Sequence, residues 1–137
     1  MPARYLLDTN IVSYLLKNPI PAVQSRYFEA GADSIAISSI TEAEVFYGIA
    51  KRPGAKRLRI AAEEFFAAAT VAGWDSAAAR AYGLLRADQE RKGRPLSVED
   101  LMIAAHALSL GLTLVTHDSA FSFVDGLKTE DWTVGKS

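Results

Sequence analysis

The sequence lacks cysteine altogether and has no marked excess of charge of either sign. Without cysteine the chain has no disulfide framework, no thiolate zinc site and no cysteine nucleophile, which fits a reducing cytosol. Its 15 basic and 16 acidic residues give a formal net charge of -1. This balance argues against a protein that coats nucleic acid non-specifically by charge, but locally segregated charge still permits an enzyme that binds nucleic acid.

Long apolar runs are absent as well. The longest uncharged stretch, residues 101–117, falls short of the ~18 or more apolar residues of a membrane span and contains His106 and Gly111. A helix followed by a strand is the better interpretation of this stretch. At the N-terminus, Asp8 interrupts the apolar run that a secretory signal requires. We therefore expect no membrane span and a cytoplasmic location.

Apolar residues nevertheless make up 50% of the 137 residues, enough for a domain with a buried core. Short β-branched runs alternate with stretches of helical periodicity. Strands are predicted at 4–7, 35–40, 70–72 and 112–116, with an edge strand at 132–134, and helices at 11–16, 20–32, 41–50, 56–69, 75–92 and 98–110. Apolar strands that alternate with helices predict a mainly parallel sheet covered on both faces. The expected fold is one α/β domain over residues 1–137.

Four acidic residues fall where this architecture concentrates functional groups. Asp8 follows the first strand, and Asp118 follows the strand at 112–116. Glu44 and Asp100 lie in the first turns of two predicted helices. In open α/β sheets, ligands bind in the crevice beyond the carboxyl ends of the strands. We therefore expect these four carboxylates to converge in one site.

Converging carboxylates need a counter-charge. Two charges 4 Å apart interact by about 4 kcal/mol even at an effective dielectric constant of 20. Such a cluster either takes up protons or binds a cation, and an all-oxygen ligand set favours Mg²⁺ or Mn²⁺ over zinc. Divalent ions activate water and stabilise the attacking and leaving oxygens of an in-line phosphoryl displacement. The pattern therefore predicts metal-dependent cleavage of phosphodiester bonds.

Helix capping is the competing interpretation of these acids. Asp100 and Glu44 each complete a pattern close to a capping box, with a Ser or Thr three residues earlier. Asp118 has the sequence context of a turn residue. Glu42 competes with Glu44, because two residues apart on a helix point about 200° away from each other and only one can face the site.

The histidines and the basic residues have simpler interpretations. His106 is predicted to be a buried packing residue and His117 a loop residue. The basic residues form two groups, Lys51, Arg52, Lys56, Arg57 and Arg59 in one and Arg91, Lys92 and Arg94 in the other. Each group is either a solvated helix end or a grip on a phosphate backbone beside the acids. No sequence-reading module for nucleic acid is visible.

Four ordered blocks of the chain carry a family resemblance. They are YLLDTNI at 5–11, ISSITEAEVFYG at 37–48, DLMIAAHAL at 100–108 and LVTHD at 114–118. In this order they resemble PIN-domain ribonucleases and, within them, the VapC-type toxins of toxin–antitoxin modules. One such block is a weak signal, whereas four in order through nearly the whole chain are specific.

The resemblance implies a three-layer α/β/α fold and Mg²⁺- or Mn²⁺-dependent cleavage of RNA. It places the family's acidic positions at Asp8, Glu44 rather than Glu42, Asp100, and Asp118, the position at which the family varies most. It also implies a homodimer and a VapB-type antitoxin that obstructs the acidic site. Glu99 stands where many relatives carry Asn and adds negative charge.

Contacts to the RNA are expected from four further residues. The resemblance places Thr116 at a hydroxyl position near the metal centre, and Asn10, Lys51 and Arg52 complete the predicted set.

Other functions compete with this one. A haloacid dehalogenase-like phosphatase needs a second Asp two residues after the first, where this chain has Asn10, and no Lys near the last strand meets the need of a receiver domain. A housekeeping PIN nuclease without an antitoxin and a non-catalytic PIN module that binds RNA or protein remain open.

Overall fold

Five parallel strands form one sheet. The computed structural model describes residues 3–94 and 96–134, so the ends of the predicted domain (1–2 and 135–137) and Pro95 lie outside the described residues. The strands are β1 (Tyr5–Leu7), β2 (Ile35–Ser38), β3 (Thr70–Ala72), β4 (Thr113–Val115) and β5 (Thr129–Glu130). They pair in the order β3-β2-β1-β4-β5, and every pairing is parallel, as predicted.

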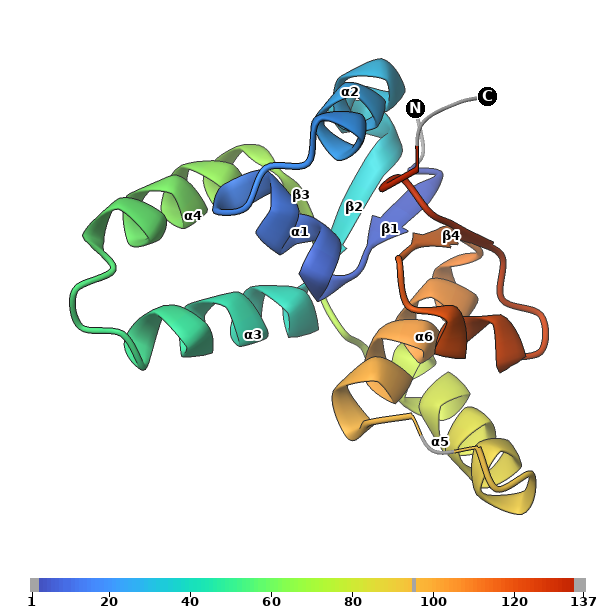
Figure 1. Cartoon of the computed structure of the whole chain (residues 1–137). Helices are drawn as coiled ribbons and strands as arrows, with labels where there is room; N and C mark the ends of the chain where they lie inside the picture. Colours follow the sequence, from blue (N-terminus) through green and yellow to red (C-terminus); the bar gives the residue numbers. More distant parts are fainter. Residues whose placement is uncertain (1–2, 95, 135–137) are drawn as a thin grey trace.

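Helices connect the strands. They are α1 (Thr9–Leu16), α2 (Pro21–Ala30), α3 (Ser39–Ala50), α4 (Lys56–Ala68), α5 (Ser76–Arg91) and α6 (Val98–Leu110), with short 3-10 helices at Ala32–Ser34 and Ser119–Phe123. Figure 1 shows α3 and α4 projecting together on one side, with α5 and α6 on the other. Within the described residues, no helix is long and apolar enough to cross a membrane.

The two faces of the sheet pack into separate cores. Successive residues of a strand point to opposite faces. Leu6 and Leu114 pack with residues of α5 and α6, whereas Leu7 and Val115 pack with residues of α1, α2 and α4. All four of these strand residues are fully buried. The predicted three-layer α/β/α arrangement is therefore confirmed.

The chain reverses the direction in which it builds the sheet at β1. It first adds β2 and β3 on one side of β1, and later adds β4 and β5 on the other. Leu7 pairs with Val115, and the backbone N–H of Asp8 donates to the carbonyl of Val115 at 3.0 Å. Ligand crevices form at such switch points, outside the carboxyl ends of the strands. Asp8 and Thr116, which follow β1 and β4, therefore lie side by side at this point.

The predicted end of the strand at 35–40 was wrong. It stops at Ser38, because the Ser38 hydroxyl accepts a hydrogen bond from the backbone N–H of Ile40 at 3.0 Å and caps α3. A serine cap satisfies a helix N–H that lacks an intrahelical partner, and here it outweighs the β-propensity of Ile40. Thr41 is consequently inside the helix, so the expected capping box ending at Glu44 is absent.

The predicted edge strand at 132–134 was also wrong. The last strand is Thr129–Glu130, and Trp132 is instead a buried core residue with an exposed fraction of 1%. Its indole N–H donates to Glu130 Oε1 at 3.0 Å. The apolar signal at Trp132 reflected burial rather than strand pairing.

The helix predicted at 98–110 was correct at both ends. Ser97 caps α6 by accepting a hydrogen bond from the backbone N–H of Asp100 at 3.1 Å. Gly111 ends the helix with φ of 68°, in the left-handed region that glycine tolerates best. These two ends place Asp100 in the first turn of the helix.

Candidate active site

Asp8 ends β1 and also caps α1. Its Oδ1 accepts a hydrogen bond from the backbone N–H of Ile11 at 2.9 Å, so α1 begins at Thr9, two residues before the predicted start. Its Oδ2 accepts a hydrogen bond from the Thr116 hydroxyl at 2.5 Å. The carboxylate is therefore held from two elements, in a site that leaves the residue 5% exposed.

Burial makes Asp8 an unusually weak acid. It raises the pKa of Asp8 from 3.8 to about 6, although hydrogen bonds from Thr116 and Ile11 act to lower it. The negative charges of Asp100 and Asp118 raise the pKa further. Among residues 3–94 and 96–134, no salt bridge involves Asp8, so its ionised form at neutral pH is a buried charge that a bound cation would offset.

Thr116 connects Asp8 to Asp118. While its hydroxyl donates to Asp8, the same oxygen accepts a hydrogen bond from the backbone N–H of Asp118 at 3.0 Å. Asp118 is exposed, and its Oδ1 accepts from the backbone N–H of Ala120 at 2.9 Å, which caps the 3-10 helix at 119–123. Asp118 is therefore a turn residue, and its charge also raises the pKa of Asp8 and of Asp100.

Glu44 faces the same region from α3. Its Oε1 accepts a hydrogen bond at 2.9 Å from the hydroxyl of Thr9, the residue that directly follows Asp8 in the chain. Burial raises the pKa of Glu44, the bond from Thr9 lowers it, and the charges of Glu99 and Asp100 raise it. Since positions two apart on a helix point about 200° away from each other, Glu42 does not share this orientation.

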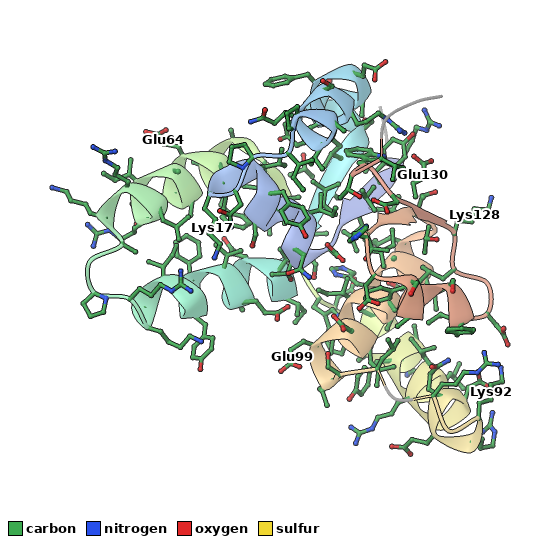
Figure 2. The ribbon with its side chains drawn as sticks, viewed as in Figure 1. Lys17, Glu64, Lys92, Glu99, Lys128 and Glu130 are labelled. Carbon is green, nitrogen blue, oxygen red and sulfur yellow. The ribbon has the colours of Figure 1, made fainter. Side chains whose placement is uncertain are left out.

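Asp100 enters from the first turn of α6. Burial is the main cause that raises its pKa, a hydrogen bond with Ser97 lowers it, and the charges of Asp118 and Glu99 raise it. Figure 2 shows Glu99 at this end of α6. Helix capping and a position near another acid are compatible here, because Ser97 caps the helix while the charge of Asp118 raises the pKa of Asp100.

The oxygen donors of this acidic site, defined as Asp8, Glu44, Asp100 and Asp118, fit a hard divalent cation. A carboxylate oxygen has two lone pairs, so Asp8 keeps acceptor capacity beyond its hydrogen bonds. Carboxylate oxygens are the ligands that Mg²⁺ and Mn²⁺ prefer. Within the described residues, no three acidic or histidine side chains already stand close enough to enclose an ion. The negative charges of these carboxylates repel one another, and a bound divalent cation would offset that repulsion.

The residues predicted to contact RNA lie in three different places in the structure. Thr116 lies inside the acidic site. Lys51 and Arg52 line a pocket of about 220 Å³ between α1 and α3, and Glu44 lines the same pocket. Asn10 is exposed in the first turn of α1, and no hydrogen bond within the described residues joins it to the acids.

Sequence reasoning assigned no role to Thr9 or Trp74. Thr9 holds Glu44, and its only sequence signal is its position after Asp8. The backbone N–H of Trp74 donates to Ser39 Oγ at 3.0 Å, and its indole N–H donates to the carbonyl of Met102 at 2.9 Å. Trp74 thus joins the start of α3 to α6, a contact that carries no local sequence signal.

Both histidines lie as expected. His106 is 1% exposed, and its Nδ1 lies 2.8 Å from the hydroxyl oxygen of Ser38. His117 is an exposed loop residue whose Nδ1 lies 2.8 Å from Asp131 Oδ2. This contact with Asp131 is the main cause that raises the pKa of His117.

This chain is similar in sequence to known proteins over nearly its whole length. The PIN domain family matches residues 5–127. The tRNA(fMet)-specific endonuclease VapC of Shigella flexneri is 40% identical over 131 residues, which cover 95% of this chain and 98% of that protein. Ribonuclease VapC2 of Haemophilus influenzae is 36% identical over 94% of this chain and 98% of its own length.

Solved structures of VapBC complexes contain chains with a fold similar to that of this chain. The DNA-bound VapBC complex from Salmonella typhimurium contains a chain that matches with a TM-score of 0.89 at 35% identity, over 95% of this chain and 98% of that chain. VapBC2 from Rickettsia felis, bound to a promoter DNA fragment, contains a chain that matches with a TM-score of 0.87 at 31% identity. The match covers 93% of this chain and 98% of that chain. The chain therefore belongs to the PIN domain family, among the VapC ribonucleases.

Proposed function

We propose that Asp8, Glu44, Asp100 and Asp118 form the metal centre with which this VapC-type ribonuclease hydrolyses RNA. The observation that carries the proposal is the buried carboxylate of Asp8 at the switch point of the sheet, where the Thr116 hydroxyl joins it to the backbone of Asp118 and Thr9, the next residue, holds Glu44. Burial raises the pKa of Asp8 to about 6, and the charges of Asp100 and Asp118 raise it further. A buried acid whose pKa is raised by neighbouring acids is a functional-site signature, because a bound cation offsets the negative charge that these acids bring together.

Asp8, Asp100 and Asp118 would hold the ions, either directly or through water, and Mg²⁺ or Mn²⁺ fits their oxygen donors. When bound, such ions supply an activated water and neutralise charge that develops on the phosphate. The residues of the chain set the geometry. Thr116 and Ile11 fix the two oxygens of Asp8, which restricts the orientation of this carboxylate.

Glu44 would either bind metal or orient the attacking water. Its hydrogen bond from Thr9 holds Oε1 and leaves Oε2 for this role. Its raised pKa makes the carboxylate more basic than an exposed glutamate, which favours the acceptance of a proton from water. In-line attack by water leaves a 5′-phosphate and a 3′-hydroxyl end.

The relatives indicate the substrate and partners to test. The relative from Shigella flexneri is named for tRNA(fMet), so this tRNA is the first RNA to test. The chains of the Salmonella typhimurium and Rickettsia felis complexes pair with an antitoxin, so this chain is the toxin of a VapB-type antitoxin. It acts in the cytoplasm, as a homodimer. Lys51 and Arg52, beside Glu44, and Thr116 and Asn10, beside Asp8, contact the RNA.

The decisive experiment compares induced expression of the wild type with that of Asp8→Asn and maps RNA 5′ ends in the cell. New 5′ ends and growth arrest are expected with the wild type alone. Purified protein should cleave tRNA(fMet) with Mg²⁺ or Mn²⁺ but not with EDTA. Full activity of Asp8→Asn would overturn the assignment of Asp8 to the metal centre. RNA binding without cleavage by the wild type would identify a non-catalytic module instead.

A further inference from the structure

The two basic groups of the sequence differ sharply in the structure. In the group near the end of α5, Lys92 bonds to Asp88 at 2.9 Å and to Asp125 at 2.6 Å, and Arg91 bonds to Asp88 at 3.2 Å. Arg94 donates to a backbone carbonyl at 3.3 Å. These cations are largely neutralised, so this group is a solvated helix end rather than a phosphate grip.

The group near the α3–α4 connection has no such partners. Among the described residues, no salt bridge involves Lys51, Arg52, Lys56 or Arg59. Lys51 lies over the ring of Tyr47, 4.6 Å from its centre, and this contact is made with an uncharged ring rather than with an acid. Unpaired positive charge of this kind is available to phosphates.

Most of these cations also line two adjoining pockets, one of which includes Glu44 of the acidic site. Lys17, Lys51 and Arg52 line the pocket of about 220 Å³ together with Glu44. A second pocket of about 480 Å³, between the end of α3 and the start of α4, shares Ile49 and Arg52 with the first. It adds Lys56 and Arg59 to the lining, together with one acid, Glu63.

Figure 2 shows Lys17 at the end of α1, whereas Lys92 lies far away, just after the end of α5. Figure 1 shows that α3 and α4 form the two sides of one projecting arm. The two pockets and their lining cations Lys17, Lys51, Arg52, Lys56 and Arg59 are here called the basic groove. Lys17 follows the end of α1, Lys51 and Arg52 follow the end of α3, and Lys56 and Arg59 lie in the first turns of α4.

We propose that the basic groove binds the phosphate backbone of the RNA on one side of the cleaved bond. The inference rests on the proposed function, because Glu44 lines one of the two pockets of the groove, but it adds Lys17, Lys56 and Arg59 to the substrate contacts. Backbone contacts of this kind position a strand without reading its sequence. A strand that extends from Glu44 into the two pockets meets these cations.

The test is RNA binding in the Asp8→Asn background with EDTA, so that cleavage plays no part. The probe is a fluorescein-labelled single-stranded oligoribonucleotide, and anisotropy is measured over a range of salt concentrations. Arg52→Gln with Arg59→Gln removes two cations of the basic groove. Each phosphate contact contributes about 0.7 to the slope of log K against log salt for a single strand. The slope should therefore become shallower by about 1.4, which is a roughly 25-fold loss of affinity at 0.1 M salt.

The matched control is Arg57→Gln with Arg91→Gln. It removes the same charge, but neither residue lines the groove, and Arg57 lies beside Lys56 on the same helix. Its slope should stay close to that of the parent. Equal slopes for both pairs would overturn the proposal, because the groove cations would then make no more phosphate contacts than the control cations do. If the wild type fails to cleave RNA but the groove variants alone lose binding, the proposed function fails while the groove proposal stands.

Discussion

His106 on α6 and Ser38 at the end of β2 are joined by a buried contact of 2.8 Å between Nδ1 and Oγ. The same Ser38 oxygen accepts the hydrogen bond from Ile40 that caps α3. One hydroxyl therefore ties the start of the helix that carries Glu44 to the helix that carries Asp100. The relative position of Glu44 and Asp100, which are distant in the chain, depends on this contact and on the two hydrogen bonds by which Trp74 also links α3 to α6.

Replacing Ser38 with Ala tests this contact. The substitution removes a helix cap, worth about 1 kcal/mol, and leaves the buried Nδ1 of His106 without its partner, at a cost of about 1–3 kcal/mol. The free energy of unfolding, measured with urea, should fall by about 2–4 kcal/mol. Ser97→Ala is the matched control, because it removes an exposed serine cap alone and should cost about 1 kcal/mol. Equal losses would mean that the His106 contact contributes nothing.

Asp8→Asn should stabilise the metal-free protein at neutral pH. The folded-state pKa of about 6 exceeds the ordinary 3.8, so the native state holds this proton more tightly than the unfolded state. The stability of the wild type therefore falls as pH rises from 3.8 to about 6, and the loss is complete above pH 6. A shift of this size corresponds to about 3 kcal/mol. An asparagine keeps an acceptor for Ile11 and offers an N–H to the Thr116 oxygen.

Urea unfolding in EDTA measures this gain. Asp8→Asn should be more stable than the wild type by up to about 3 kcal/mol above pH 6, and the difference should vanish near pH 3.8. A difference independent of pH would show that the buried charge is not its cause. Added Mg²⁺ should raise the melting temperature of the wild type and leave that of the variant nearly unchanged.

Glu99→Asn should shift the pH profile of cleavage toward acid. The charge of Glu99 raises the pKa of both Glu44 and Asp100, so its removal lowers these pKa values. The ionised forms of Glu44 and Asp100 then persist to lower pH. The acid limb of the profile of kcat/KM against pH therefore shifts to lower pH. Glu42→Gln removes an equal charge that does not contribute to either shift, and its profile should match that of the wild type. Identical profiles for all three proteins would contradict the electrostatic role of Glu99.

Thr9→Val should impair cleavage without unfolding the protein. It removes the hydroxyl that holds Glu44 Oε1 and keeps the shape of the side chain. A hydrogen bond to a charged group is worth about 1.5–3 kcal/mol, which corresponds to a roughly 10- to 150-fold fall in kcat/KM. Thr9→Ser keeps the hydroxyl and should restore most of the activity. A serine variant as weak as the valine variant would show that packing, rather than the bond to Glu44, matters.

Local sequence signals located most elements because their causes are local. The helix at 98–110 was predicted at both ends, since a serine cap and a glycine stop are short-range features. The end of β2 was misplaced because capping by Ser38 competes with the β-branched pattern of Ile40. The edge strand failed because a buried Trp132 resembles a strand residue in sequence alone.

By itself, the amino-acid order determined the layers, the parallel sheet and the kinds of side chain at strand ends, because apolar periodicity and helix capping act over a few residues. Only the tertiary structure decided that β4 lies beside β1, which brings Thr116 to Asp8 across 108 positions of the chain. It also decided which basic group is neutralised by Asp88 and Asp125 and which stays unpaired. Electrostatic and hydrogen-bond partners depend on distance in space, and distance in space follows from the strand order.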